Sequence, residues 1–218
     1  MKQTLLTRNE LYKNLIELDE ETLVQKFIAI GKKYNYPIFK SNKKYPINLN
    51  IWGIRSNSEH TDYFNDVITV FYNTNNKWIC NIYEATTDPS NKNLINPVNN
   101  KGCAVLIPDY YPKLWKLGYH KGSYRALVQA KPCNIYRDNN KDDIINYGDE
   151  LKIDRGMFGI NLHRASIKQT TDQIGLYSAG CQVIKNANEF KDLMELCERA
   201  IGTGYQSYVL INEDLLKL

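Results

Sequence analysis

Short runs of β-branched and aromatic residues, separated by Asn, Asp, Gly and Pro, fill the chain from about residue 46 onward. The clearest pair is DVITVFY and KWICNIYEAT, at 66–72 and 77–86, which flank the tetrapeptide NTNN. A short polar connection between two such runs predicts a β-hairpin. Further strand candidates lie at 102–108, 124–130, 132–138, 156–163 and 206–212. This middle part of the chain is therefore expected to be mainly antiparallel sheet.

Helical periodicity marks the first part of the chain. Apolar residues recur there at i, i+4 and i+7, and these residues are Leu11, Leu15 and Leu18, then Leu23, Phe27 and Ile30. Thr7 and Glu10 have the spacing of a capping box. The pattern predicts two short helices that end near Gly31.

One further helix is predicted close to the C-terminus. Asn186 and Glu189 have the spacing of a cap, and an apolar stripe follows, made of Phe190, Leu193, Met194, Cys197 and Ile201. The expected fold class is α+β. We expect a helical extension over residues 1–45, followed by a mainly antiparallel β domain over residues 46–218 that contains this helix.

Composition argues against several classes of protein. The formal net charge is only +4 over 218 residues and the lysines are dispersed, so a nucleic-acid partner is not expected. No apolar run approaches the ~20 residues that a membrane-spanning helix needs. The first residues lack the apolar core of a signal peptide. We therefore expect a protein that is synthesised in the cytoplasm and has no membrane span.

The five cysteines are an odd number without C-x-x-C spacing, which favours reduced thiols over a disulfide framework. Cys80, Cys103, Cys133 and Cys197 lie in or beside apolar runs and are expected to be structural. The sequence contains none of the close pairs, such as C-x-x-C or H-x-x-x-H, that zinc sites normally show. Neither a metal nor another cofactor is expected.

Cys181 differs from the other cysteines because it follows Ser178, Ala179 and Gly180 in a turn of small residues. Such a turn lets a backbone approach a substrate closely and can aim N–H groups at a developing oxyanion. His163 ends an apolar run, from which its side chain can point into a cleft as a base. The alternative interpretation is a cysteine packed under a turn.

Four other polar residues have ordinary explanations. His60 lies in a polar stretch and is expected in a solvated loop, whereas His120, in GYHKGSY, is expected in a turn, with a substrate contact as the less favoured role. Arg55, in IWGIRSNS, follows a further expected strand, and Asp88, in TTDPS, precedes a proline. Such positions are more typical of a surface ion pair and of a turn than of catalysis. We assign none of the four to the catalytic set.

The order of His163 and Cys181 resembles that of a known family. L,D-transpeptidases of the YkuD type have a histidine at a strand end and, some fifteen to twenty residues later, Ser/Thr-His-Gly-Cys; here the second segment is SAGCQV. A phage-associated variant is more similar still, because this chain also has GINLHRA, TTDP and YRALVQ, so the resemblance covers about residues 48–211. Ala179 replaces the family's second histidine, and Val183 replaces a common Arg or Asn.

This resemblance implies an L,D-transpeptidase-like β-sandwich or barrel and a thioester mechanism on peptidoglycan stem peptides. Cys181 would be the nucleophile and His163 the base, its ring held by the backbone carbonyl of Arg164. The N–H groups of Gly180 and Cys181 would bind the oxyanion, and Ser178 would support the turn. The Arg164 side chain is a candidate to bind a substrate carboxylate.

The dyad is compatible with several functions. Attack of an amine on the thioester gives a cross-link and attack of water gives hydrolysis, and the sequence does not decide between them. Without a visible signal peptide or wall-binding module, hydrolysis by a phage-type lysis or virion-associated enzyme is favoured, acting at the cell wall after release, with virion or lysis-system partners. The alternatives are a non-catalytic virion or wall-binding protein that retains the fold, and a cytoplasmic thiol peptidase acting on proteins.

Overall fold

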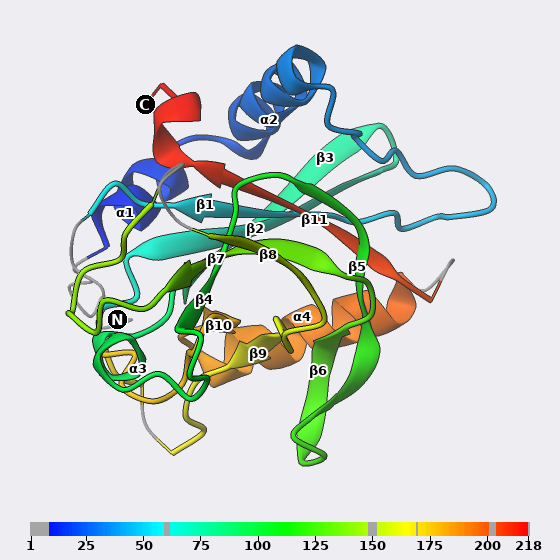
Figure 1. Ribbon diagram of the computed structural model, residues 1–218. Coiled ribbons are helices and arrows are strands. Elements are labelled where there is room, and N and C mark those ends of the chain that lie inside the picture. The colour runs from blue at the N-terminus through cyan, green and yellow to red at the C-terminus, as the bar shows by residue number, and fades with distance from the viewer. Residues whose placement is uncertain (1–8, 59–61, 148–151, 169, 201–203, 218) are drawn as a thin grey trace.

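A computed structural model describes residues 9–58, 62–147, 152–168, 170–200 and 204–217 (Figure 1). The helices are α1 (Glu10–Ile16), α2 (Glu20–Tyr34), α3 (Asn91–Ile95) and α4 (Ala187–Arg199), with a 3₁₀ turn, η1 (Glu213–Leu215). The strands are β1 (Asn50–Arg55), β2 (Asp66–Thr74), β3 (Lys77–Thr86), β4 (Cys103–Leu106), β5 (Tyr110–His120), β6 (Tyr124–Gln129), β7 (Cys133–Asp138), β8 (Ile153–Gly156), β9 (Leu162–Arg164), β10 (Gln182–Ile184) and β11 (Gln206–Asn212).

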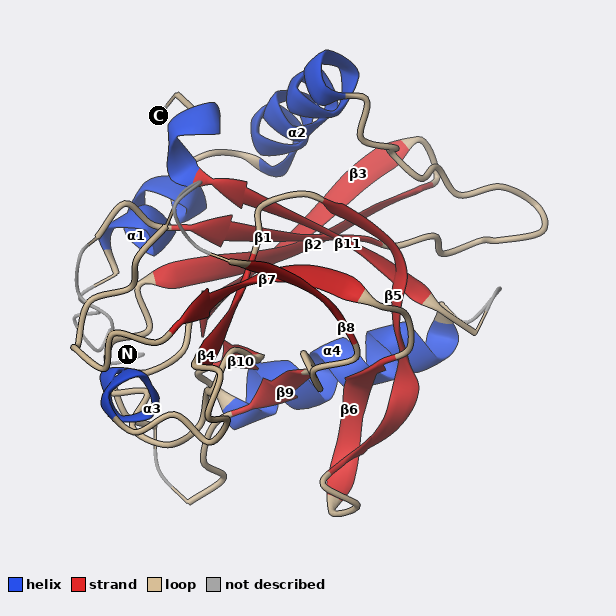
Figure 2. Cartoon of the chain, in the orientation of Figure 1, coloured by secondary structure: helices blue, strands red, loops and turns tan. Residues whose placement is uncertain are grey.

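Eight strands close into a barrel in the order β1-β11-β5-β6-β9-β10-β3-β2, and β4, β7 and β8 form a smaller sheet. All neighbouring pairs are antiparallel except β1–β11 and β9–β10, which are parallel. Figure 2 shows the helices on the outside of this barrel, with α1 and α2 on one side and α4 on the opposite side. The predicted α+β class with a mainly antiparallel sheet is confirmed.

The hairpin predicted over residues 66–86 is also confirmed. Strands β2 and β3 pair from Asp66 and Ala85 to Thr74 and Lys77. Asn75 and Asn76 connect them with φ angles of 48° and 61°. A two-residue type I′ turn needs these left-handed conformations, and asparagine adopts them more readily than most residues.

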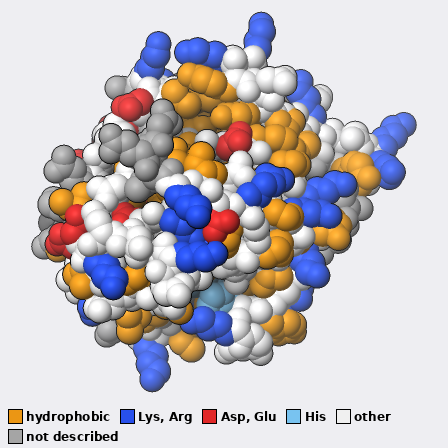
Figure 3. Space-filling view, in the orientation of Figure 1, with side chains coloured by type: hydrophobic (Ala, Val, Ile, Leu, Met, Phe, Trp, Pro, Cys, Tyr) orange, Lys and Arg blue, Asp and Glu red, His pale blue; other side chains and the backbone are white. Residues whose placement is uncertain are grey.

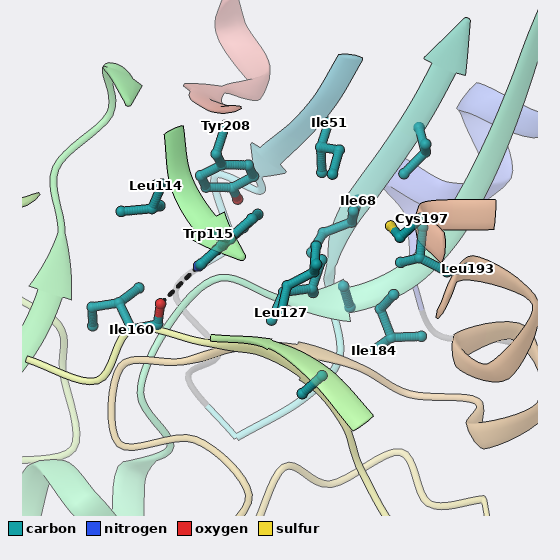
Figure 4. Close-up of a cluster of buried hydrophobic side chains, with 14 of the residues drawn as sticks. Ile51, Ile68, Leu114, Trp115, Leu127, Ile160, Ile184, Leu193, Cys197 and Tyr208 are labelled. Carbon is teal, nitrogen blue, oxygen red and sulfur yellow. Dashed lines mark hydrogen bonds between the residues drawn. The ribbon is translucent and has the colours of Figure 1, made fainter. Parts of the chain in front are cut away.

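The interior of the barrel is filled by large apolar side chains. Trp115 on β5 packs on Tyr208 on β11, with ring centroids 4.5 Å apart, and its indole N–H donates to the carbonyl of Ile160 over 2.8 Å (Figure 4). Leu193 and Cys197 of α4 contribute to the same cluster. The late helix is thus confirmed, and its apolar stripe covers one side of the barrel core. Ile201, the last residue expected in that stripe, lies outside the described residues.

The N-terminal helices pack on the outer face of the barrel. Phe27 of α2 lies against Trp52 and Phe71, with ring centroids 5.1 and 5.0 Å away. Asn9 caps α1 by accepting from the Tyr12 N–H, while its amide group donates to carbonyls at the start of β2. The extension therefore shares a hydrophobic cluster with β1, β2, β3 and β11.

The predicted helix boundaries need correction. Asn9 is the residue that caps α1, whereas the expected cap, Thr7, lies outside the described residues. Helix α2 continues past Gly31 to Tyr34, because Asn35 provides the left-handed C-cap with φ of 58° and donates its N–H to the Gly31 carbonyl.

Residues 156–163, predicted as one strand, are divided between β8 and β9. The intervening segment turns at Gly159, which has φ of 75°. The side-chain oxygen of Gln129 accepts hydrogen bonds from the N–H groups of Phe158 and Ile160 over 2.9 and 3.0 Å. A side chain therefore takes the place of the backbone hydrogen bonds of a neighbouring strand. This break places His163 in the middle of the short strand β9 rather than at the end of a long one.

All five cysteines are free thiols, and Cys80, Cys103, Cys133 and Cys197 are buried, as predicted. None of the described helices combines the length and apolar character required to cross a bilayer. Among the described residues there is also no cluster of three or more side chains suited to hold a metal ion.

Candidate active site

Two adjacent parallel strands bring Cys181 and His163 together. Val183 on β10 pairs with His163 on β9, and the Gln182 N–H donates to the Asn161 carbonyl over 2.9 Å. Pairing therefore puts Val183 and His163 on the same face. Cys181 immediately precedes β10, two residues before the partner of His163, and packs against the cluster that contains Val183. The residues that sequence analysis chose as nucleophile and base are neighbours at this pair of strands.

A backbone carbonyl fixes the tautomer of His163. Its Nδ1 lies 2.9 Å from the Arg164 carbonyl oxygen. Because a carbonyl can only accept, Nδ1 carries the proton, and in the neutral ring that burial favours, Nε2 keeps its lone pair. His163 Nε2 is buried and has no hydrogen-bond partner in the described structure. The ring therefore presents an unused basic nitrogen.

Tyr124, the first residue of β6, supports the same arrangement. Its hydroxyl oxygen lies 3.2 Å from His163 Nδ1 and 3.3 Å from the Arg164 carbonyl. The hydroxyl can accept from Nδ1–H while donating to the carbonyl. The guanidinium of Arg164 lies over the Tyr124 ring at 4.0 Å and donates to the Ala165 carbonyl. Sequence reasoning missed Tyr124, although its YRALVQ segment contributed to the resemblance.

His120 opens the turn between β5 and β6, as expected, since its carbonyl accepts from the Ser123 N–H over 2.9 Å, and its side chain lies against His163. It ends β5, and the two imidazoles stack with centroids 4.0 Å apart. The Asn161 side-chain oxygen accepts from the Gln129 N–H over 2.8 Å, so its amide nitrogen faces His120 Nδ1 at 3.2 Å. That nitrogen can only donate, so His120 Nδ1 is unprotonated. His120 and His163 therefore both present neutral rings to each other.

Burial favours the neutral forms of both His163 and Cys181. Desolvation, reinforced by the neighbouring His120, lowers the pKa of His163 to about 3, although the Arg164 carbonyl opposes this shift. Desolvation also raises the pKa of the Cys181 thiol, against the backbone N–H of Asn161. At neutral pH the two groups are a thiol and an imidazole, so a proton must move when the sulfur attacks.

The turn before Cys181 requires glycine. Gly180 has φ of 119°, and a Cβ there would lie 2.3 Å from the Ala104 carbonyl oxygen. The Ser178 hydroxyl accepts from the Gly180 N–H and donates to the Cys181 carbonyl over 3.2 and 2.8 Å. The Gly180 N–H is thus engaged within the turn. Of the two amides expected at an oxyanion site, only that of Cys181 makes no hydrogen bond to another described residue.

The segment after β3 anchors this turn. The Ser178 carbonyl accepts from the Ser90 N–H over 3.0 Å and from the Asn93 side chain over 2.7 Å. On the other side of Cys181, the Gln182 amide donates to the Thr87 carbonyl. The TTDPS segment therefore contributes to the site through backbone positioning, and the short helix α3 follows it.

Arg55, expected at the surface, is instead buried in a charged cluster. It is 2% exposed, and its Nε lies 2.7 Å from Asp88 Oδ1. Behind it, Asp66 is 1% exposed and accepts from the N–H groups of Ser56 and Thr87 and from the Thr87 hydroxyl. In the sequence, Asp66 is marked only by its place at the start of a strand candidate.

Cys181 and His163 lie at the same mouth of the barrel as Arg55 and Asp66. Strands β1 and β3 end there, and β2, β9 and β10 begin there. Figure 3 shows histidine surface over β9, between lysine and arginine side chains. Since His60 lies outside the described residues, that surface belongs to His120 or His163, which are 8% and 2% exposed. Half-buried Cys181 is the most accessible cysteine of the five.

Comparison with models of protein families, with curated proteins and with solved structures finds no match to this chain.

Proposed function

We propose that this protein is a cysteine-dependent enzyme that acts on the stem peptides of peptidoglycan through a thioester on Cys181. The observation that carries the proposal is the unpartnered, unprotonated Nε2 of His163, on the strand beside Cys181. A buried acceptor without a donor costs stability, so its retention points to a use in chemistry. The motif resemblance supplies the substrate class.

The reaction starts from the neutral pair. As Cys181 Sγ attacks the peptide carbonyl, its proton passes to His163 Nε2, and the oxyanion meets the Cys181 N–H. The Arg164 carbonyl and the Tyr124 hydroxyl hold the imidazolium through Nδ1–H. A histidine with a low pKa is a strong acid once protonated, so it readily gives the proton to the leaving amine. This step breaks the C–N bond and leaves a thioester.

In the reaction that we favour, water hydrolyses the thioester and regenerates the free thiol of Cys181. His163 Nε2 takes a proton from water as its oxygen attacks the thioester, and the proton then returns to the cysteine sulfur. An amine acceptor would instead give a cross-linked product. We propose hydrolysis by a phage-type lysis or virion-associated enzyme, which would reach the wall after release and work with virion or lysis-system partners. In this setting the Arg164 side chain is a candidate partner for a substrate carboxylate.

A second candidate function is a non-catalytic virion or wall-binding protein. One observation favours it: the Cys181 thiol donates to the Gly159 carbonyl over 3.2 Å instead of to His163. An enzyme needs a rotation of this side chain when substrate binds, since catalytic hydrogen bonds often form only in the complex. A binding protein would keep the thiol where it is.

Mass spectrometry of digested peptidoglycan separates these functions. The wild type should release stem-peptide fragments, and Cys181→Ala should release none. Synthetic peptides ending in a D-residue should be shortened by that residue, and an added D-amino acid should appear in the product only if transfer occurs. Cleavage of an all-L peptide with no action on D-terminated peptides would overturn the peptidoglycan assignment. Intact peptidoglycan in both reactions would favour the binding protein.

A further inference from the structure

The turn before Cys181 supplies only one donor for an oxyanion. Oxyanion sites are built from converging N–H groups of the backbone and of side chains, histidine among them. Of the two backbone amides expected for this role, the Gly180 N–H donates to the Ser178 hydroxyl over 3.2 Å, which leaves the Cys181 N–H. A second donor would have to come from another element that faces the same site.

His120 reaches the base from the neighbouring hairpin. Its imidazole stacks on that of His163, with centroids 4.0 Å apart and an angle of 29° between the ring planes. In the pairing of β5 and β6, His120 is the register partner of Tyr124, so both side chains lie on one face of the hairpin, with ring centroids 5.5 Å apart. The Tyr124 hydroxyl in turn contacts Nδ1 of His163. His120 therefore belongs to the same cluster of side chains as the base.

Asn161, the residue before β9, connects His120 to the thiol. Its backbone N–H is directed at the Cys181 sulfur, where it favours the thiolate by lowering the pKa of that group. Its side-chain nitrogen faces His120 Nδ1 at 3.2 Å. The orientation of this amide is set, because its oxygen accepts from the Gln129 N–H over 2.8 Å. A single residue thus contacts both groups, which places the His120 ring beside the thiol as well as beside the base.

The Asn161 amide also determines which nitrogen of His120 carries the proton. An amide nitrogen can only donate, so Nδ1 is the acceptor and Nε2 carries the hydrogen of the neutral ring. Burial, together with the positive charges of Lys121 and Arg164, lowers the pKa of His120 and favours this neutral ring. The side chain is 8% exposed, and its Nε2 makes no hydrogen bond to another described residue. Unlike Nε2 of His163, this nitrogen is open to solvent. A largely buried histidine therefore presents a free N–H donor at the site.

We propose that His120 is the second oxyanion donor, and that its Nε2–H binds the substrate carbonyl oxygen while Cys181 attacks. This inference rests on the proposed thioester mechanism and adds a residue to it. As the C–S bond forms, an electron pair of the carbonyl moves onto oxygen, which accepts from the Cys181 N–H and from His120 Nε2–H. The thiol proton passes to His163, and His120 keeps its own proton throughout. When the C–N bond breaks, the oxygen becomes a carbonyl again and both donors are released.

Two matched variants separate this role from a structural one, because glutamine places an amide near the Nε2 position of histidine and asparagine places one near Nδ1. His120→Gln keeps an N–H donor toward the substrate, so its kcat on a D-terminated peptide should stay within about tenfold of the wild type. His120→Asn keeps only the contact with Asn161. Its kcat should fall by about 10²–10³-fold, the usual effect of a lost oxyanion donor, with KM unchanged. Equal kcat values, or a higher kcat in His120→Asn, would overturn the donor role.

Nitrogen-15 NMR of protein labelled at histidine tests the tautomers in the wild type itself. At neutral pH, His120 should have a protonated Nε2 and an unprotonated Nδ1, whereas His163 should have the reverse. The spectrum of either variant identifies the His120 signals. A proton on Nδ1 of His120 would overturn the inference even if one variant does not fold. A wild type that cleaves no peptide would instead overturn the proposed function, whereas an active wild type with equal kcat in both variants would reject His120 alone.

Discussion

His163 and Asp66 lie at the same mouth of the barrel and are 2% and 1% exposed, yet burial shifts their pKa values in opposite directions. The pKa of His163 falls to about 3 and that of Asp66 rises to about 7, in each case chiefly because burial disfavours the charged form. Their surroundings differ. Asp66 accepts three hydrogen bonds, whereas His163 Nε2 accepts none. The filled acceptor positions of Asp66 suit a structural role, whereas the unused lone pair of His163 Nε2 suits a base.

The largest expected effect tests the base. His163→Gln should lower kcat/KM on a D-terminated peptide by about 10²–10⁴-fold, the usual contribution of general-base catalysis. The free energy of unfolding at neutral pH should fall by only about 1 kcal/mol, because the Nδ1–H bond to the Arg164 carbonyl is lost while Nε2 makes no hydrogen bond. Steady-state kinetics and urea unfolding on the same preparation measure both. Activity within tenfold of the wild type would remove His163 from the mechanism.

Arg55 should show the reverse pattern, a loss of stability. Arg55→Met leaves Asp66 and Asp88 buried without their cation and should cost about 3–5 kcal/mol in the free energy of unfolding. Arg125→Met is the matched control, because Arg125 pairs with Glu198 at the surface, where both side chains are more than 40% exposed. Its cost should stay below about 1 kcal/mol. Equal costs in urea unfolding would mean that the buried cluster contributes no more than a surface pair.

The free energy of unfolding should depend on pH in opposite ways for His163 and Asp66. The folded pKa of His163, about 3, lies below the unfolded value, so its contribution is present above about 6.5 and is lost as the pH falls toward 3. The folded pKa of Asp66, about 7, lies above the unfolded value, so its contribution is present below about 3.9 and is lost as the pH rises to 7.

Urea unfolding between pH 4 and 7 therefore compares the wild type with two variants. His163→Gln should reduce the loss of stability toward acid, and Asp66→Asn should reduce the loss toward neutral pH. One titrating proton gives a slope of at most about 1.4 kcal/mol per pH unit. Parallel stability curves for all three proteins would contradict both assignments.

The smallest expected effect concerns Tyr124. Tyr124→Phe removes the hydroxyl that bridges His163 Nδ1 and the Arg164 carbonyl, and should lower kcat several-fold, equivalent to about 1 kcal/mol, while KM stays unchanged. Tyr119→Phe, on the neighbouring strand and 59% exposed, is the control and should change neither constant. A change in KM alone would assign Tyr124 to substrate binding instead of to positioning of the base.

Residue patterns along the sequence correctly predicted the elements whose signals lie within a single short segment. The 66–86 hairpin alternates cleanly between two asparagine-linked runs, and the helix after Asn186 has both a cap and an apolar stripe. Strand β5 was missed because Pro112 and Lys113, the latter with φ of 53°, interrupt its alternation. Elements that depend on local sequence alone were thus the predictable part of the fold.

The site was predictable only in part, because its residues meet through long-range pairing. The motif pointed to Cys181 and His163, but Tyr124 and His120 reach them through the pairing of β5, β6 and β9. The burial of Arg55 likewise depends on Asp66 and Asp88, from other strands and loops. No pattern around Arg55 itself distinguishes this position from the surface ion pair that was expected.

The most direct test is the intact mass of the protein after it is mixed with a tetrapeptide that ends in a D-residue. The wild type should gain the mass of the tripeptidyl group, and peptide mapping should place it on Cys181 as a thioester that hydroxylamine removes. His163→Gln should form this adduct far more slowly, and Cys181→Ala should not form it. Product release without any adduct, or an adduct that persists in Cys181→Ala, would contradict the account.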